Sequence, residues 1–249
     1  MTELVHLDIA DQVATITLDS QPNRNALSRQ LVTELDNALV VAGTEESVRA
    51  VVVAAAGPVF CSGADLSEAA GEGMEQGARS LVALQRRIVA CPKPVVVRLH
   101  GPVRAGGLGI VGAADVVVAL DSVSFAFTEV RLGLAPAAIS LTTLPRLTDR
   151  AAALAYLTGS TFDAAEAARI GLVTQVVDGP GLDAAVAEVV AALREGVPQG
   201  LRETKALLNA ALLDRIDALG ETVALQSARL FASDEAKAAM RAFLDRRKG

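Results

Sequence analysis

The sequence has no tryptophan, and aromatic residues make up only 3% of its 249 residues. Apolar residues nevertheless reach 51%, so the core must be built from Ala, Val, Leu and Ile. The two cysteines, Cys61 and Cys91, do not suggest a disulfide framework. Acidic residues outnumber basic ones, and the net charge of −6 argues against nucleic acid and anionic membranes as main partners.

Long apolar runs are also missing. The longest charge-free stretches, residues 50–64 and 132–145, both contain proline and are too short to cross a bilayer. The N-terminus carries Glu3 and Asp8 and lacks the basic start and apolar run of a signal peptide. We therefore expect a cytoplasmic protein whose length fits one large domain, alone or with a small helical appendage.

Strand and helix patterns alternate in the first part of the chain. Residues 4–9 and 13–18 are rich in apolar and β-branched residues around a short polar break, which predicts a hairpin. Ser28 can cap a helix whose apolar stripe reaches Leu39. The run 48–54, apolar except for Arg49, predicts a strand buried on both faces. Strand, helix and strand in this order predict a βαβ unit.

The alternation continues and then gives way to helices. Residues 79–90 predict a helix that ends at a proline pair, and residues 95–99 predict a buried strand. Strands are expected again at 115–119 and 124–127. We therefore expect an α/β core over about residues 1–145, followed by a helical tail. The tail has helical patterns at 150–157, 164–170 and 182–193 and an apolar repeat of Leu208, Leu212, Ile216 and Leu219.

Two glycine-containing loops after buried strands carry the candidate chemistry. They are FCSGADL at residues 60–66 and HGPVRAGGLG at residues 100–109. Glycine lets backbone approach a ligand closely, and free amides at a helix start attract negative charge. One amide from each loop could hold a developing oxyanion. The other reading, which spacing alone favours, is a pair of tight turns beneath helix–sheet contacts. The segment 105–109 does not match the dinucleotide pattern G-x-G-x-x-G.

Several segments, taken together in their order, resemble the crotonase superfamily of enoyl-CoA hydratases and isomerases. The resemblance covers nearly the whole chain, and the ordered set is specific to the superfamily rather than to one reaction. The segments are PNRNALS at 22–28, FCSGADL at 60–66, Gly106-Gly107 with Asp115 downstream, FTEVRLGL at 127–134 with Pro136, and the later Thr158-Gly159, 164–168 and 171–173.

The resemblance implies an α/β fold of the ClpP/crotonase type, a spiral of ββα units. It places this core at residues 1–190 and a C-terminal helical trimerisation region at 191–249. The expected assembly is a homotrimer, or a hexamer built as a dimer of trimers. An acyl-CoA thioester is the implied ligand, in fatty acid metabolism such as β-oxidation. No metal and no separate cofactor are expected, since coenzyme A is part of the substrate.

By the same resemblance, Glu129 is the catalytic carboxylate and the amides of Ala64 and Gly106 form an oxyanion hole. A thioester conjugated to a double bond becomes enolate-like when water adds or a proton leaves. Negative charge then develops on the thioester oxygen, and losing one fixed hydrogen-bond donor to it costs roughly 3–4 kcal/mol. A partly desolvated carboxylate suits the proton transfer. The substrate-binding residues implied are Arg24, Ala26, Leu27, Asp65, Leu66, Gly107 and Phe243, the last in a region that can reach a neighbouring CoA site.

Two departures from the family pattern concern this site. Gly109 stands where hydratases have a second glutamate, a pattern of some Δ3,Δ2-enoyl-CoA isomerases. The segment that starts at Glu129 also resembles a hydratase branch, including methylglutaconyl-CoA hydratase-like members, with glycine at the same place. The sequence AAIS at 137–140 replaces the usual Gly-Ala-Gly-Gly, which affects an amide that would position water. Residues 67–79 and 137–144 are expected to form the pocket wall.

We therefore favour an enoyl-CoA hydratase-like lyase and keep three alternatives open. They are an enoyl-CoA isomerase, an acyl-CoA-binding protein without turnover, and a scaffold that binds no CoA. Structural roles are favoured for the other candidate side chains: Arg104 as a surface or phosphate-side charge, Asp65 and Glu68 as capping or exposed acids, His6 and His100 as structural histidines, and Cys61 as a packing residue.

Overall fold

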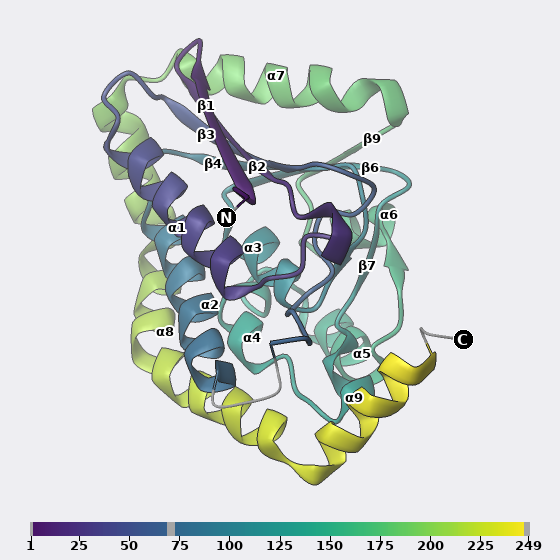
Figure 1. Cartoon of the computed structure of the whole chain (residues 1–249). Coiled ribbons are helices and arrows are strands. Elements are labelled where there is room, and N and C mark those ends of the chain that lie inside the picture. Colours follow the sequence, from purple (N-terminus) through teal and green to yellow (C-terminus); the bar gives the residue numbers. More distant parts are fainter. Residues whose placement is uncertain (1, 69–72, 247–249) are drawn as a thin grey trace.

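The computed structural model describes residues 2–68 and 73–246, and its centre is a six-stranded sheet with helices on both faces (Figure 1). The strand order is β1-β2-β3-β4-β6-β9. Only β1 and β2 pair antiparallel, and every other pairing in this sheet is parallel. The strands are β1 (Val5–Ala10), β2 (Val13–Leu18), β3 (Ala50–Ala55), β4 (Val95–Leu99), β6 (Val116–Leu120) and β9 (Gln175–Val177).

A small second sheet holds the two glycine-containing loops. It consists of β5 (Val103–Arg104), β7 (Ser124–Ala126) and β8 (Phe162–Asp163). Isolated bridges join Cys61 to Val103 and Leu27 to Ala64, so both loops are hydrogen-bonded into one layer. The loops are thereby fixed next to each other although they are far apart in sequence.

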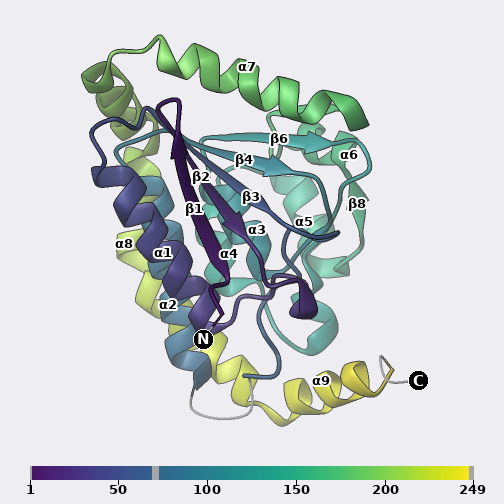
Figure 2. The ribbon, with the colours of Figure 1, turned by 45° about the horizontal axis from the view of Figure 1, so that its top comes forward.

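Helices cover both faces of the main sheet. Val51 and Val53 pack on the face covered by α1, α2 and α3, whereas Val52 packs against α7 on the other face (Figure 2). This alternation follows from the two-residue period of a strand. The helices are α1 (Arg29–Thr44), α2 (Gly73–Ala90), α3 (Gly106–Ala113), α4 (Ala137–Thr143), α5 (Asp149–Thr158), α6 (Ala164–Arg169), α7 (Leu182–Arg194), α8 (Pro198–Ala232) and α9 (Asp234–Arg246), with short 3-10 turns η1 (Gln21–Asn23), η2 (Thr128–Leu132) and η3 (Gly179–Gly181).

Most predicted elements are confirmed. The N-terminal hairpin forms, and β2 and β3 pair in parallel with α1 as the connecting helix. Ser28 caps α1 by accepting a hydrogen bond from the amide of Leu31. The predicted helix at 79–90 begins earlier, at Gly73. The expectation of an α/β core that ends near residue 145 is wrong in part, because the predicted helical tail also contains β8, in the small sheet, and β9, in the main sheet. In the part of the chain described here, no helix combines the length and apolarity needed to cross a membrane.

A buried ion pair anchors the long helix α8 to the core. The ammonium of Lys205, whose side chain is only 6% exposed, lies 2.7 Å from Oδ2 of Asp115. The same ammonium donates to the carbonyls of Ile88 and Lys93, each at 3.0 Å. Asp115 also accepts from the amide of Val95 at 2.7 Å. A paired and hydrogen-bonded charge of this kind fixes the position of α8 against α2 and the sheet.

Candidate active site

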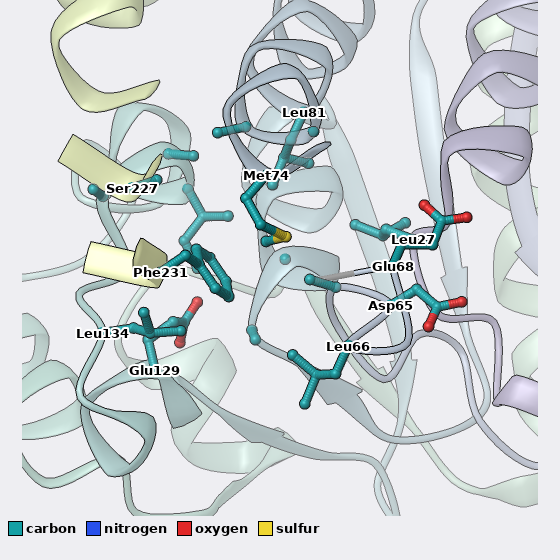
Figure 3. Close-up of a pocket in the computed structure, with 18 of the residues that line it drawn as sticks. Leu27, Asp65, Leu66, Glu68, Met74, Leu81, Glu129, Leu134, Ser227 and Phe231 are labelled. Atoms are coloured by element: carbon teal, nitrogen blue, oxygen red, sulfur yellow. The ribbon is translucent and has the colours of Figure 1, made fainter. Parts of the chain in front are cut away.

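A cavity of about 180 Å³ lies where the two glycine-containing loops meet α2, the η2–α4 segment and the junction of α8 with α9. Leu27, Asp65 and Glu68 lie on one side of the cavity, and Glu129, Leu134 and Phe231 lie on the other (Figure 3). Its lining is mostly apolar. A cavity with few polar groups can orient a ligand through those groups.

One residue from each glycine-containing loop supplies a candidate oxyanion donor. Ala64 and Gly106 both line it. A Cβ on Gly106 would lie 3.7 Å from the amide nitrogen of Ala64, so the two loops are in close contact. In the described residues, the amide of Ala64 donates to no backbone or side-chain acceptor, and that of Gly106 opens α3, where no intrahelical acceptor exists. The pair can therefore donate to one oxygen of a ligand.

The residues before these two amides have unusual backbone geometry. Ala105, the residue before α3, has φ 45° and ψ −120°, and its own amide is held by the carbonyl of Ala126 at 3.1 Å. Gly63 has φ 100°, a value that side chains rarely tolerate. A Cβ on Gly63 would lie 3.0 Å from that of Ala105. Strained backbone held by surrounding hydrogen bonds is typical of a preorganised site.

The carboxyl of Glu129 lies on the far side of the cavity, at the start of η2 (Figure 3). Its Oε2 atom is buried, and no described residue offers it a hydrogen bond. Burial raises the pKa of this carboxyl to about 7, and a hydrogen bond from its own backbone amide offsets part of that rise. A carboxyl that exchanges its proton near neutral pH suits general acid–base chemistry.

The position of the missing second acid is filled by other side chains. A Cβ on Gly109 would lie 2.9 Å from Cγ2 of Ile139 and 3.0 Å from Cδ of Gln85. Gln85 is fully buried, donates to the carbonyls of Leu81 and Ala138, and accepts from the hydroxyl of Thr142 at 2.6 Å. Because this carboxamide is held on both ends, it cannot move aside at little cost.

Replacing Gly109 by alanine is therefore expected to lower the free energy of unfolding by about 1–3 kcal/mol through overpacking. Gly200, in α8, is a matched control because a Cβ there would meet nothing within 4 Å. Gly200→Ala should leave stability unchanged or raise it by up to about 1 kcal/mol. Urea unfolding of both variants makes the comparison. If Gly109→Ala is as stable as Gly200→Ala, the side chains of Gln85 and Ile139 can shift at little cost in free energy.

Several residues predicted to bind substrate line the cavity. Leu27, Asp65 and Leu66 do so, and Phe243 does so in its own chain. Whether Phe243 also reaches a neighbouring site stays a prediction. The predicted wall segments contribute as well, through Met74 and Gln76–Ala78 from the first and Ala137–Ile139 from the second; residues 69–72 of the first segment lie outside the described part of the chain.

The structure places three other predicted binding residues away from the cavity. Gly107 is buried, and a Cβ there would lie 2.8 Å from Cβ of Cys61, so its small size permits helix–strand packing. Ala26 is also buried. Arg24 is exposed beside the loops, and its carbonyl accepts from the amide of Ser62 at 3.1 Å. Their roles in substrate binding stay predictions.

The side chains for which structural roles were favoured have structural contacts. Arg104 donates to the carbonyl and hydroxyl of Ser124 at 2.5 and 2.8 Å. Glu68 accepts from the amide of Arg29 at the start of α1, and His100 lies 2.6 Å from the carbonyl of Gly57. The remaining cases follow the same pattern: Asp65 accepts from Asn23 and Ser67, His6 lies near Glu3 and Asp19, and burial raises the pKa of the Cys61 thiol to about 12.

Sequence reasoning missed the side of the cavity that is formed by the end of α8. Ser227, Leu230 and Phe231 line it there. These residues are part of a long helix whose apolar residues give no sign of a pocket, and no local signal marks them. Contacts between segments that are distant in sequence bring Leu230 and Phe231 against Leu134, close to Glu129.

The fold and the paired loops define a crotonase-type α/β protein. The chain matches the family described as enoyl-CoA hydratase/isomerase over residues 8–249. The crystal structure of an enoyl-CoA hydratase from Mycobacterium avium is 47% identical and superposes with a TM-score of 0.92, covering 99% of this chain and 98% of that one. An enoyl-CoA hydratase from Mycobacterium avium subsp. paratuberculosis K-10 is 28% identical, with a TM-score of 0.88 and coverage of 98% and 96%.

One sequence relative is named for a different substrate. The mevalonyl-coenzyme A hydratase of Aspergillus fumigatus is 31% identical over 245 residues, which are 95% of this chain and 90% of that protein. The protein therefore belongs to the enoyl-CoA hydratase/isomerase family and has the crotonase fold.

Proposed function

We propose that this protein is an enoyl-CoA hydratase that adds water to a 2-enoyl-CoA thioester. The observation that carries the proposal is Glu129, a buried carboxyl with a pKa raised to about 7, in the same cavity that Ala64 and Gly106 line. Relatives named as enoyl-CoA hydratases support the reaction. The acyl-CoA thioester is the substrate, and no separate cofactor is required.

In the proposed mechanism, the thioester oxygen accepts hydrogen bonds from the amides of Ala64 and Gly106. Glu129, as a carboxylate, takes a proton from water while the water oxygen bonds to carbon 3. The electron pair of the double bond moves toward the thioester oxygen, where the two donors stabilise the charge. Glu129 then returns the proton to carbon 2, so that one water is added and the carboxylate is regenerated.

A second candidate, isomerisation of a 3-enoyl-CoA, is favoured by the packing at Gly109. Gln85 and Ile139 fill the space of a second acid, so one carboxyl serves all proton transfers. In an isomerase, Glu129 would take a proton from carbon 2 and return it to carbon 4, with no water added. The same oxyanion donors would stabilise the dienolate between these steps.

Purified protein offered a 2-enoyl-CoA and, separately, a 3-enoyl-CoA distinguishes the two reactions. Hydration removes the ultraviolet absorbance of the conjugated thioester, whereas isomerisation creates it. We expect the 2-enoyl ester to be consumed. If only the 3-enoyl ester is converted, the protein is an isomerase and the hydratase proposal is wrong. Binding of both esters without turnover would identify an acyl-CoA-binding protein, and no binding at all would favour a scaffold.

We further propose a homotrimer, or a hexamer built from two trimers, with residues 191–249 as the trimerisation region. Large apolar side chains on α5 and α8 support an interface, because Leu154 and Leu157 are 66% and 76% exposed and Leu207 and Leu208 are 81% and 75% exposed. Exposed apolar patches commonly mark contacts between subunits. Light scattering after gel filtration should give the mass of three or six chains.

A further inference from the structure

The end of the cavity beyond Glu129 is closed by an apolar roof, formed where α8 meets α9. Leu230 and Phe231, the last large residues of α8, pack with Leu134 and Leu132. In Figure 3 the ring of Phe231 lies next to Leu134, above the carboxyl of Glu129. A thioester bound at the two loop amides would therefore direct its acyl chain toward this ring.

The roof is fixed from outside by α9. Ala236 and Met240 of α9 are buried against Leu134. Gly133 makes this packing possible, because a Cβ there would lie 3.2 Å from the amide nitrogen of Ala236, and its φ of 70° also suits glycine. With α9 seated on Gly133, Phe231 is held over the cavity rather than free to turn outward.

The charges of the cavity lie away from this roof, except for Glu129. Of the described residues that line the cavity, Arg29 is the one with a cationic side chain, and it belongs to the start of α1, next to Glu68. The acyl end has the aliphatic side chains of Leu132, Leu134 and Leu230. A carboxylate on an acyl chain would lose its water there, lack a cation and lie near Glu129, which is costly in an apolar site.

We propose that the site selects an uncharged hydrocarbon acyl group and that Phe231 limits the length of the chain it accepts. This inference rests on the proposed use of the cavity for acyl-CoA thioesters. It goes further in naming the class of acyl group and one residue that determines specificity. Phe231 acts by occupying the volume that a longer chain would need.

Binding of saturated acyl-CoA thioesters to the full chain, measured by calorimetry, tests the proposal. Saturated esters can be neither hydrated nor isomerised by the proposed routes, so affinity is read without turnover. From butyryl-CoA upward, affinity should rise by about fourfold per added methylene. It should stop rising when the chain reaches Phe231. Glutaryl-CoA should bind at least about tenfold more weakly than pentanoyl-CoA, which has the same number of acyl carbons.

In Phe231→Ala, affinity should continue to rise to longer chains, while butyryl-CoA binds as it does to the unchanged protein. Phe231→Leu, which keeps the apolar contact with the roof, should shift the limit in the same direction by less. Leu225→Ala is the matched control, because Leu225 lies on α8, is 46% exposed and is outside the cavity lining. Circular dichroism establishes that each variant folds.

Two results would overturn the inference. One is a length profile that is the same in the unchanged protein and in both Phe231 variants. The other is equal affinity for glutaryl-CoA and pentanoyl-CoA. Either result would leave the proposed hydration of a 2-enoyl-CoA standing. Conversely, a protein that does not hydrate a 2-enoyl-CoA could still show the expected dependence of affinity on chain length. Absence of binding for every acyl-CoA would instead remove the function on which the inference rests.

Discussion

Glu129→Gln is expected to lower turnover of a 2-enoyl-CoA by about 10²–10⁴-fold, the usual contribution of a positioned proton-transfer group. Glutamine keeps the shape of the side chain but cannot take a proton from water. Affinity for a saturated acyl-CoA should change little, since the amides of Ala64 and Gly106 are retained. Steady-state kinetics and calorimetry measure the two effects. Glu188→Gln, an exposed change on α7, should keep full activity.

The same substitution should change stability in a pH-dependent way. The pKa of Glu129 is raised from its ordinary 4.5 to about 7, so the folded protein binds this proton more tightly than the unfolded chain. Its stabilising contribution is therefore fully present below pH 4.5 and is lost as pH rises through 7. Activity of the unchanged protein should fall in the opposite direction, below about pH 7, as the carboxylate is protonated.

Glu129→Gln, which stays neutral, should consequently be more stable than the unchanged protein by about 1–3 kcal/mol at pH 8. The difference should vanish near pH 4. Urea unfolding at both pH values measures it. Retained turnover in this variant, or a stability difference that does not depend on pH, would contradict the role given to the buried carboxyl.

Lys205→Met is expected to lower the free energy of unfolding by about 3–5 kcal/mol, because it leaves the carboxylate of Asp115, which is only 17% exposed, without its cation. The carbonyls of Ile88 and Lys93 would also lose their donor. Urea unfolding at a fixed protein concentration measures the loss, since subunit association contributes to apparent stability. A loss below about 1 kcal/mol would show that the pair does not anchor α8.

A double variant distinguishes the loss of the ion pair from a general loss of packing as the cause of lower stability. Lys205→Met combined with Asp115→Asn removes both charges and should be more stable than Lys205→Met alone, because no uncompensated charge remains. Lys237→Met is the matched control, since Lys237 is exposed on α9. It should change stability by less than about 0.5 kcal/mol. Equal losses in the single and double variants would assign the effect to packing.

The sequence was sufficient for those parts of the fold that depend on local pattern. The run of valines in β3 predicted a strand buried on both faces, and Ser28 marked the start of α1 through its capping hydroxyl. The glycines of the two loops marked the places where backbone could face a ligand. Glu129 stood out because it follows an apolar strand, and the structure buries its carboxyl.

The remaining features depend on contacts between distant segments, which local pattern does not encode. Gln85 is a polar residue in an amphipathic helix, and nothing nearby in sequence indicates that its amide is fully buried against Gly109. Asp115 meets Lys205 only after α8 docks. The start of α2 was missed because Gly71, Gly73 and Gly77 interrupt the sequence there, and glycine weakens a helical pattern.

The roof over Glu129 also has a consequence for the order in which the protein matures. The loops, the main sheet and Glu129 are all synthesised before the segment that contains Phe231, Ala236 and Met240. Until that segment is made, the growing chain lacks the apolar roof over its proton-transfer group. The end of α8 and the last helix, α9, enclose it together. In a chain that lacks Phe231 and α9, the carboxyl of Glu129 would be in contact with water, and its pKa would be closer to that of an ordinary glutamate.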